Sequence, residues 1–279
     1  MKHALVSHWM TKEVIVGDQH MRLHDALRLV NKMNIRALPV VNNDELVGIV
    51  TKRDLLRADT TSILKEWTDQ YRLIGNLPLE KIMSVAVITT QSNAHIAAAA
   101  RLLLDNKITA LPVVDDNKHM SGILTSSDVF RMIIDEVPLL PAKIKVGDYM
   151  SRDLITIDPN ANLLEAQRSM AVKRVRALPV VQDGLLLGIV TLSDLLSASP
   201  SMAVSQGRQE VNMMVMDTPI CFIMTSSPMT VQEDANIIEA ARLMLENKIH
   251  CLPVMNSQQD LVGIITESDL FRMIILRFL

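Results

Sequence analysis

The residues with the clearest capacity for chemistry are four threonine–aspartate pairs in the pattern Thr-x-x-Asp. They are Thr51 and Asp54, Thr125 and Asp128, Thr191 and Asp194, and Thr266 and Asp269. A hydroxyl followed three residues later by an acid is typical of a helix start, where both groups cap backbone N–H groups. The same pattern also fits a ligand site, because a carboxylate can bind the cis-diol of a ribose and a helix N-terminus attracts phosphate.

Two basic residues lie inside the first of these pairs. Lys52 and Arg53 occupy the positions held in the other copies by Ser126-Ser127, Leu192-Ser193 and Glu267-Ser268. If charge determines ligand preference, the first site should bind the more anionic ligand, and the fourth site should be the least suited to an anionic ligand. The alternative is that Lys52 and Arg53 lie on a solvated helix turn.

The pairs belong to a block that occurs four times. Each block has a Leu-Pro-Val strand, a polar turn, and a second apolar strand that carries a glycine six residues before the aspartate. A methionine precedes each proline by 29 residues. The methionines are Met10, Met83, Met150 and Met224; the glycines are Gly48, Gly122, Gly188 and Gly263. Repetition with constant internal spacing predicts a repeated supersecondary unit. For the glycines we favour a packing role over close approach to a ligand.

Each unit is predicted to fold as β-α-β-β-α, which places the chain in the α/β (α+β) class. In the first unit, Val14–Val16 is predicted to form a short strand, and residues 42–44 a hairpin turn. Pro39 lacks an N–H group and should therefore lie at a strand start or on an edge strand. The connector 59–78, with Trp67 and Tyr71, is predicted to contain a packed helix. The first helix of the unit carries an apolar stripe at helical spacing: Leu23, Ala26, Leu27 and Val30.

The composition excludes several classes of protein. The 279 residues carry a net charge of −3 and show no basic stripe, so we expect no nucleic-acid partner. No run of 18 apolar residues predicts a membrane span. Cys221 and Cys251 do not form a disulfide or metal framework, which favours a reducing cytoplasm. Phosphate-loop, dinucleotide, hydrolase and kinase motifs are absent, so we expect no enzyme activity.

The repeated pattern, Leu-Pro-Val followed by Gly-Ile-apolar-Thr-x-x-Asp behind an alanine-rich helix, resembles the CBS domain. The resemblance covers nearly the whole chain as four units: 6–58, 79–134, 144–198 and 219–275. It implies that units 1 and 2, and units 3 and 4, form two pseudo-symmetric Bateman modules. Such a chain is similar to the gamma subunit of AMP-activated protein kinase and to stand-alone four-CBS proteins.

The resemblance also implies adenosine-containing ligands, such as AMP, ADP or ATP, in clefts between paired units. In that family the Thr-x-x-Asp pairs face the cleft, and basic residues just before the Leu-Pro strand often contact phosphate. Those positions hold Arg36, Arg176 and His250, with Thr109 in unit 2. Arg36 and Arg176 are equivalent and would equip one cleft in each module; the alternative is an exposed residue at a strand edge. The next position departs from some nucleotide-sensing relatives, which have arginine there, and this argues against ligands with several phosphates in the even-numbered clefts.

These features predict a regulatory protein that senses adenine nucleotides and signals to a protein partner. The alternatives are a scaffold with closed clefts, a sensor of S-adenosylmethionine, and, with least support, an enzyme acting on a nucleotide. We expect a homodimer formed through apolar helix faces, unless the two modules cover each other within one chain. Those faces carry Leu55, Leu56, Val129, Phe130, Met132, Leu195, Leu270 and Phe271.

Overall fold

Four β-hairpins form the framework of the protein, whose computed structural model describes residues 4–65, 77–136, 144–198 and 216–278. Each hairpin joins the Leu-Pro strand to the glycine-containing strand. Positive φ angles of 49° at Asn43 and 66° at Asp44 confirm the predicted tight turn of the first hairpin. The hairpins are β2 (Ala37–Asn42) with β3 (Glu45–Thr51), β4 (Ala110–Val114) with β5 (Met120–Thr125), β6 (Ala177–Gln182) with β7 (Leu185–Thr191), and β10 (Cys251–Met255) with β11 (Leu261–Thr266).

One helix precedes each hairpin and one follows it, as predicted. The preceding helices are α2 (Leu23–Lys32), α5 (Ile96–Asp105), α7 (Leu163–Lys173) and α11 (Ile237–Glu246). The following helices are α3 (Lys52–Lys65), α6 (Ser126–Glu136), α8 (Leu192–Ser197) and α12 (Glu267–Phe278). The predicted apolar stripe of α2 is fully buried. Most of the connector 59–78, including Trp67 and Tyr71, lies outside the described residues. Shorter elements complete the order: α1 (Val6–Trp9), η1 (Leu79–Lys81), η2 (Val146–Asp148), η3 (Ile220–Phe222), β1 (Gly17–Asp18), β8 (Thr225–Ser226) and β9 (Val231–Gln232).

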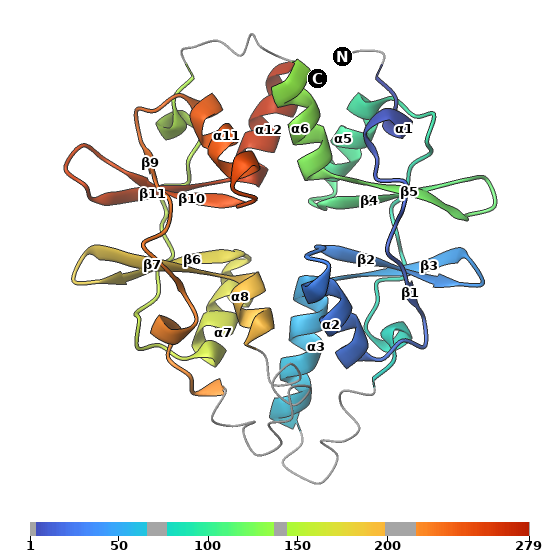
Figure 1. The fold of residues 1–279 in the computed structure, drawn as a ribbon, viewed down its shortest axis with the longest axis horizontal. Helices are drawn as coiled ribbons and strands as arrows, with labels where there is room; N and C mark the ends of the chain where they lie inside the picture. Colours follow the sequence, from blue (N-terminus) through green and yellow to red (C-terminus); the bar gives the residue numbers. More distant parts are fainter. Residues whose placement is uncertain (1–3, 66–76, 137–143, 199–215, 279) are drawn as a thin grey trace.

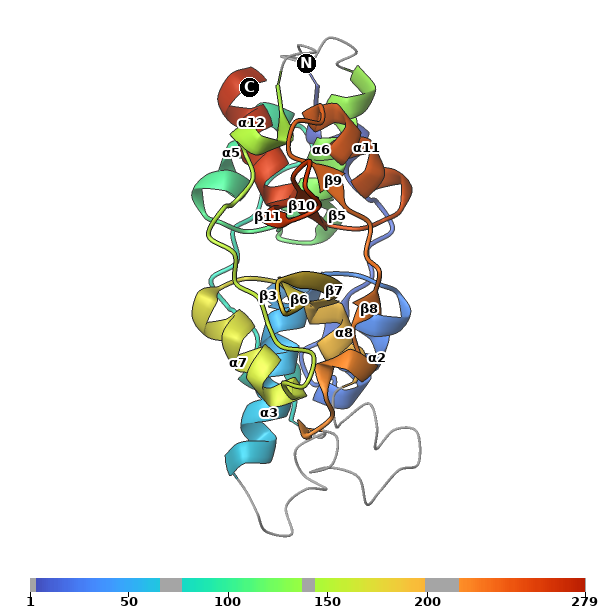
Figure 2. The ribbon, with the colours of Figure 1, turned by 90° about the vertical axis from the view of Figure 1, so that its left-hand side faces the viewer.

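The units are arranged in two layers, with units 1 and 3 in one and units 2 and 4 in the other (Figure 1). Seen from the side, the two layers of sheets face each other across the middle of the molecule (Figure 2). The hairpins of units 1 and 2 meet near their turns, where the amide of Leu46 donates to the carbonyl of Lys118 at 3.1 Å. The chain therefore forms two paired modules, one on each side.

The opening segment of each unit crosses to the sheet of its partner unit. Thr11 pairs with Ile123 of unit 2, and Ser84 pairs with Ile49 of unit 1. In both modules the methionine just before the crossing lies against the partner's glycine, so a Cβ atom added at Gly48 would come within 2.4 Å of the Met83 sulfur. The repeated methionine of one unit and the repeated glycine of its partner unit are thus the two sides of one contact, which gives both residues a packing role.

This contact makes a testable prediction. Gly48→Ala should lower the free energy of unfolding by about 1–3 kcal/mol, because the new methyl group overlaps the Met83 side chain. In a Met83→Ala background the same change should cost at least roughly 1 kcal/mol less, since the overlapping atoms are gone. Urea denaturation of the four proteins in this cycle measures both values. Equal costs in the two backgrounds would contradict the contact.

The crossing also corrects the prediction of a strand at Val14–Val16. These residues form no ladder, and the paired strand is β1, where Gly17 and Asp18 lie beside Val40 and Val41. Because Thr11 is still bound to the sheet of unit 2, the residues that follow it must span the distance between the two sheets.

The prediction that Pro39 lies at a strand start or on an edge strand is wrong. Pro39 is the third residue of β2, the central strand of the order β1-β2-β3. Opposite Pro39, Ile49 directs its N–H and C=O groups to Ser84, so this pair makes no ladder hydrogen bonds. The missing N–H would point toward the β1 side, where pairing begins only at Val40. The proline thus occupies a place in the central strand where no backbone donor is required.

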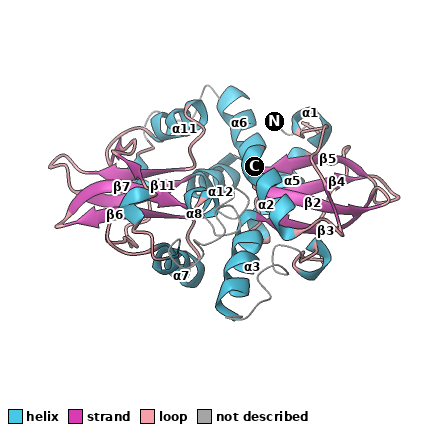
Figure 3. Ribbon diagram, turned by 60° about the horizontal axis from the view of Figure 1, so that its bottom comes forward, coloured by secondary structure: helices cyan, strands magenta, loops and turns pink. Residues whose placement is uncertain are grey.

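The hydrophobic cores run across the modules. One core joins units 1 and 3 through α3 and α8, and the other joins units 2 and 4 through α6 and α12. Figure 3 shows these helices gathered between the two groups of sheets. Every residue of the apolar helix faces predicted to form a dimer contact is at most 4% exposed. The modules therefore cover each other within one chain, which was the alternative to dimerisation through these faces. No helix within the described ranges is long and apolar enough to cross a membrane.

Candidate functional site

Closure of each hairpin brings together two positions whose residue type differs among the four units. One is the residue before the Leu-Pro strand, and the other is the first residue of the following helix. A backbone hydrogen bond joins them in every unit: Lys52 to Arg36 at 3.1 Å, Ser126 to Thr109 at 3.1 Å, Leu192 to Arg176 at 2.9 Å, and Glu267 to His250 at 2.9 Å. The strand register thus places the Cα atoms of the two residues at equivalent positions in every unit, while the residue type at each position sets the charge.

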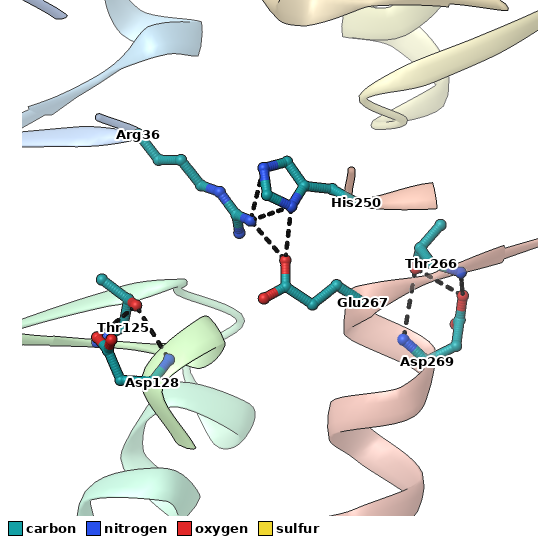
Figure 4. Close-up of polar contacts among 7 residues, drawn as sticks. All are labelled: Arg36, Thr125, Asp128, His250, Thr266, Glu267 and Asp269. Atoms are coloured by element: carbon teal, nitrogen blue, oxygen red, sulfur yellow. Dashed lines mark hydrogen bonds and ion pairs between the residues drawn. The ribbon is translucent and has the colours of Figure 1, made fainter. Parts of the chain in front are cut away.

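The charged members of these pairs meet in the middle of the molecule. Arg36 of unit 1 contacts the Glu267 carboxylate of unit 4 at 2.5 Å, and His250 Nδ1 lies 3.2 Å from the same oxygen. Arg36 also contacts both ring nitrogens of His250. Figure 4 shows the three side chains converging, with two of the Thr-x-x-Asp pairs nearby. This contact crosses from one module and one layer to the other.

Lys52 extends the site between units 1 and 3. It is 6% exposed, and its ammonium group donates to Asn34 Oδ1 at 3.2 Å and to Ser193 Oγ at 3.1 Å. Arg53 donates to the carbonyl of Val175 at 3.3 Å. Burial lowers the pKa of Lys52, and the charge of Arg36 lowers it further, against the opposing effect of Asp194. We call Arg36, Lys52, Arg53, Arg176, His250 and Glu267 the central charged cluster.

Positive charge is in excess within this cluster. Burial and the charges of Arg53 and Arg36 lower the pKa of Arg176 to about 10, while Glu267 opposes the shift. Burial alone would raise the pKa of Glu267, but hydrogen bonds from His250 and Ser127 and the charge of Arg36 hold it at about 2. Two carboxylates, those of Glu267 and Asp194, therefore act on the four basic groups of Arg36, Lys52, Arg53 and Arg176, an excess of positive charge that attracts a further anion.

The cluster is open to outside molecules. The His250 side chain is 54% exposed, and Arg176 is also exposed although protein surrounds it closely enough to shift its pKa. Two hollows of the outer surface lie elsewhere, one along α11 and one beside the ion pair of Arg152 and Glu233. Neither contains a predicted site residue. Within the cluster, solvent therefore reaches His250 and Arg176, while Lys52 and Glu267 are buried.

The Thr-x-x-Asp pairs cap their helices, as one of the two interpretations predicted. In each pair Oδ2 of the aspartate accepts a hydrogen bond from the threonine amide at 2.7–3.0 Å and another from the hydroxyl at 2.6–2.7 Å. The other oxygen, Oδ1, takes no part in these bonds; in Asp54 it lies 3.6 Å from Arg57, and in Asp128 it lies 3.7 Å from Arg131. Asp194 of unit 3 also lies near Cys251 of unit 4. Burial raises the pKa of the Cys251 thiol to about 12, and the charge of Asp194 contributes to the shift.

The sequence did not reveal that Arg36 and Arg176 lie close enough for their charges to interact. It also missed Glu267 as the partner of Arg36, and Ser193 and Asn34 as partners of Lys52. A signal was present, because equivalent positions of units 1 and 4 carry opposite charges, Lys52 and Glu267. Within the described part of the chain, no group of three His, Cys, Asp or Glu residues could hold a metal ion.

Comparison with known proteins agrees with the fold of four repeated units. The model of the CBS domain matches residues 6–60, 79–135, 146–201 and 220–276. The uncharacterized protein MJ1225 of Methanocaldococcus jannaschii is 29% identical over 94% of this chain and 95% of its own. Its crystal structure, described as that of a proposed archaeal homolog of g-AMPK, superposes with a TM-score of 0.87 over 97% of this chain and 99% of that chain. A conserved protein of Pyrococcus horikoshii, 23% identical, shares the fold with a TM-score of 0.62 over 97% of this chain and 99% of its own.

Proposed function

The chain belongs to the CBS domain family, and on that basis we propose that it is a regulatory protein that binds AMP, ADP or ATP between its paired units. The observation that carries the proposal is the proximity of Arg36, Lys52, Arg53 and Arg176, whose charges act on one another and of which Arg176 is exposed to solvent. Guanidinium and ammonium groups that lack enough carboxylates around them are suited to phosphate. The aspartate Oδ1 atoms at the helix starts are suited to ribose hydroxyls.

Binding of a nucleotide at this cluster would change the position of the units relative to one another, and a partner protein could detect that change. The central charged cluster contains residues of units 1, 3 and 4, so an anion bound there contacts both modules at once. A ligand shifts a conformational equilibrium only through its different affinity for the two states, and a shared contact provides such a difference. The similarity to MJ1225, described as a proposed archaeal homolog of g-AMPK, supports a regulated protein partner.

The decisive experiment measures AMP affinity after removal of the aspartates. We expect the combined change Asp54→Ala and Asp194→Ala to weaken binding at least about tenfold, since each removes an acceptor of charge-assisted hydrogen bonds. Both changes also remove a helix cap. Asn162→Ala is the matched control, because Asn162 caps α7 by accepting a bond from the amide of Glu165 at 2.9 Å and lies outside the cluster. Calorimetry that finds the same AMP affinity in the aspartate variant and in Asn162→Ala would refute the site.

A thermal-shift panel separates the alternatives. AMP, ADP and ATP should raise the melting temperature, and a ligand at 100 times its Kd stabilises by about 2.7 kcal/mol. S-adenosylmethionine carries a positive sulfonium group, which the cationic cluster disfavours, so its shift should be smaller. No shift with any adenosine compound would favour the scaffold.

We also propose a reducing cytoplasm as the compartment, because both cysteines are free thiols. A homodimer remains a proposal that needs a surface other than the buried helix faces. Light scattering measures it.

A further inference from the structure

Glu267 binds Arg36, a side chain that the phosphate of the proposed ligand would also bind. Its carboxylate is 9% exposed, and one oxygen binds both Arg36 and His250. Carboxylate and phosphate oxygens are recognised by the same guanidinium groups with similar geometry. Arg36 therefore cannot give its full hydrogen-bonding capacity to a phosphate while Glu267 holds it.

The contact is not a general feature of the four units. The position that Glu267 holds in unit 4 is filled by Lys52 in unit 1, Ser126 in unit 2 and Leu192 in unit 3. The carboxylate is buried among the cationic groups, and its charge acts on Arg176 as well as on Arg36. The Glu267 side chain is 9% exposed and that of Arg36 22% exposed, so separating the two charges is costly unless other partners replace the contact.

We propose that Glu267 is a built-in competing anion that determines which ligands the centre accepts. This inference rests on the proposed function and names its selectivity. A ligand with a dianionic phosphate can replace the carboxylate at Arg36, whereas a neutral nucleoside cannot. Replacement also releases a direct contact between units 1 and 4, so it couples ligand charge to the placement of the two modules.

The test compares inorganic pyrophosphate binding to the full chain and to Glu267→Gln by calorimetry. The glutamine keeps the shape of the side chain and removes the competing charge. We expect Glu267→Gln to bind pyrophosphate roughly 5- to 150-fold more tightly, the usual range of coupling between two sites. Glu233→Gln is the matched control, because Glu233 pairs with Arg152 at 2.7 Å on the outer surface and should leave the affinity unchanged.

A second variant guards against misfolding of the first. Glu267→Ser introduces the residue type that unit 2 has at position 126, and it should change the affinity in the same direction. Equal or weaker pyrophosphate binding in both Glu267 variants would overturn the inference, as would the absence of pyrophosphate binding to all four proteins.

Adenosine separates this inference from the proposed function. We expect adenosine to bind the wild type and Glu267→Gln with equal affinity, because it has no phosphate to compete for Arg36. A preference of Glu267→Gln for adenosine as large as that for pyrophosphate would overturn the inference. Failure of adenosine, AMP, ADP and ATP to bind any variant would refute the proposed function, while the pyrophosphate comparison would still decide the role of Glu267.

Discussion

Replacement of Phe130 by alanine is expected to lower the free energy of unfolding by about 3–5 kcal/mol, the usual cost of removing a buried phenylalanine side chain. Phe130 lies on α6 and is 1% exposed, in the core that unit 2 shares with unit 4. The cavity would open where α6 packs against α12, the helix of the other module. The loss should therefore weaken both modules together.

Phe222→Ala provides a matched control for this experiment. Phe222 is 80% exposed, so the same chemical change should alter stability by no more than about 0.5 kcal/mol. Chemical denaturation measures the free energies, and hydrogen exchange locates the effect. Faster exchange confined to α6, with α12 unaffected, would contradict a core shared between the modules.

Stability should fall steeply in acid because of Glu267. Its pKa is about 2 in the folded chain and 4.5 without the fold. Between these values the unfolded chain binds a proton that the folded chain does not, so stability decreases as the pH falls. The contribution of this one group, on the order of 3 kcal/mol, is fully present above about pH 5 and is lost by about pH 2.

Two variants test the acid dependence. Glu267→Gln should flatten the stability profile between pH 5 and pH 2 by about this amount, because glutamine binds no proton there. Glu233→Gln removes a carboxylate from an exposed ion pair and should leave the profile close to that of the wild type. Thermal melts across this pH range give the comparison. Parallel profiles for Glu267→Gln and the wild type would show that the ion pair with Arg36 does not stabilise the fold.

The local structure could be predicted from the sequence because it depends on near neighbours. The apolar stripe of α2, the turn at Asn43 and Asp44, and the caps formed by the Thr-x-x-Asp pairs each involve residues a few positions apart. Their fourfold repetition predicted the order of elements in each unit, and the structure confirms the helices and hairpins of that order. Propensity and capping rules apply at this range without knowledge of the tertiary fold.

The arrangement of the units could not be predicted in this way. Arg36 and Glu267 are 231 residues apart, and only the docking of two modules brings them together. The helix face with Phe130 and Phe271 looks the same in sequence whether its partner lies in the same chain or in a second copy. Pro39 shows the limit in a single strand, because its place depends on where the neighbouring strand begins.

The crossing of the opening segments constrains how such a chain can arise. Thr11 completes the sheet of unit 2, and Ser84 completes that of unit 1, so neither unit is finished by its own stretch of polypeptide. A fragment encoding one unit would lack the opening segment that its partner unit adds to the sheet, and its own opening segment would have no sheet to pair with. The pair is therefore the smallest part of the chain in which both sheets are complete. The offsets of 140 and 141 residues between matching prolines fit a duplication of that pair.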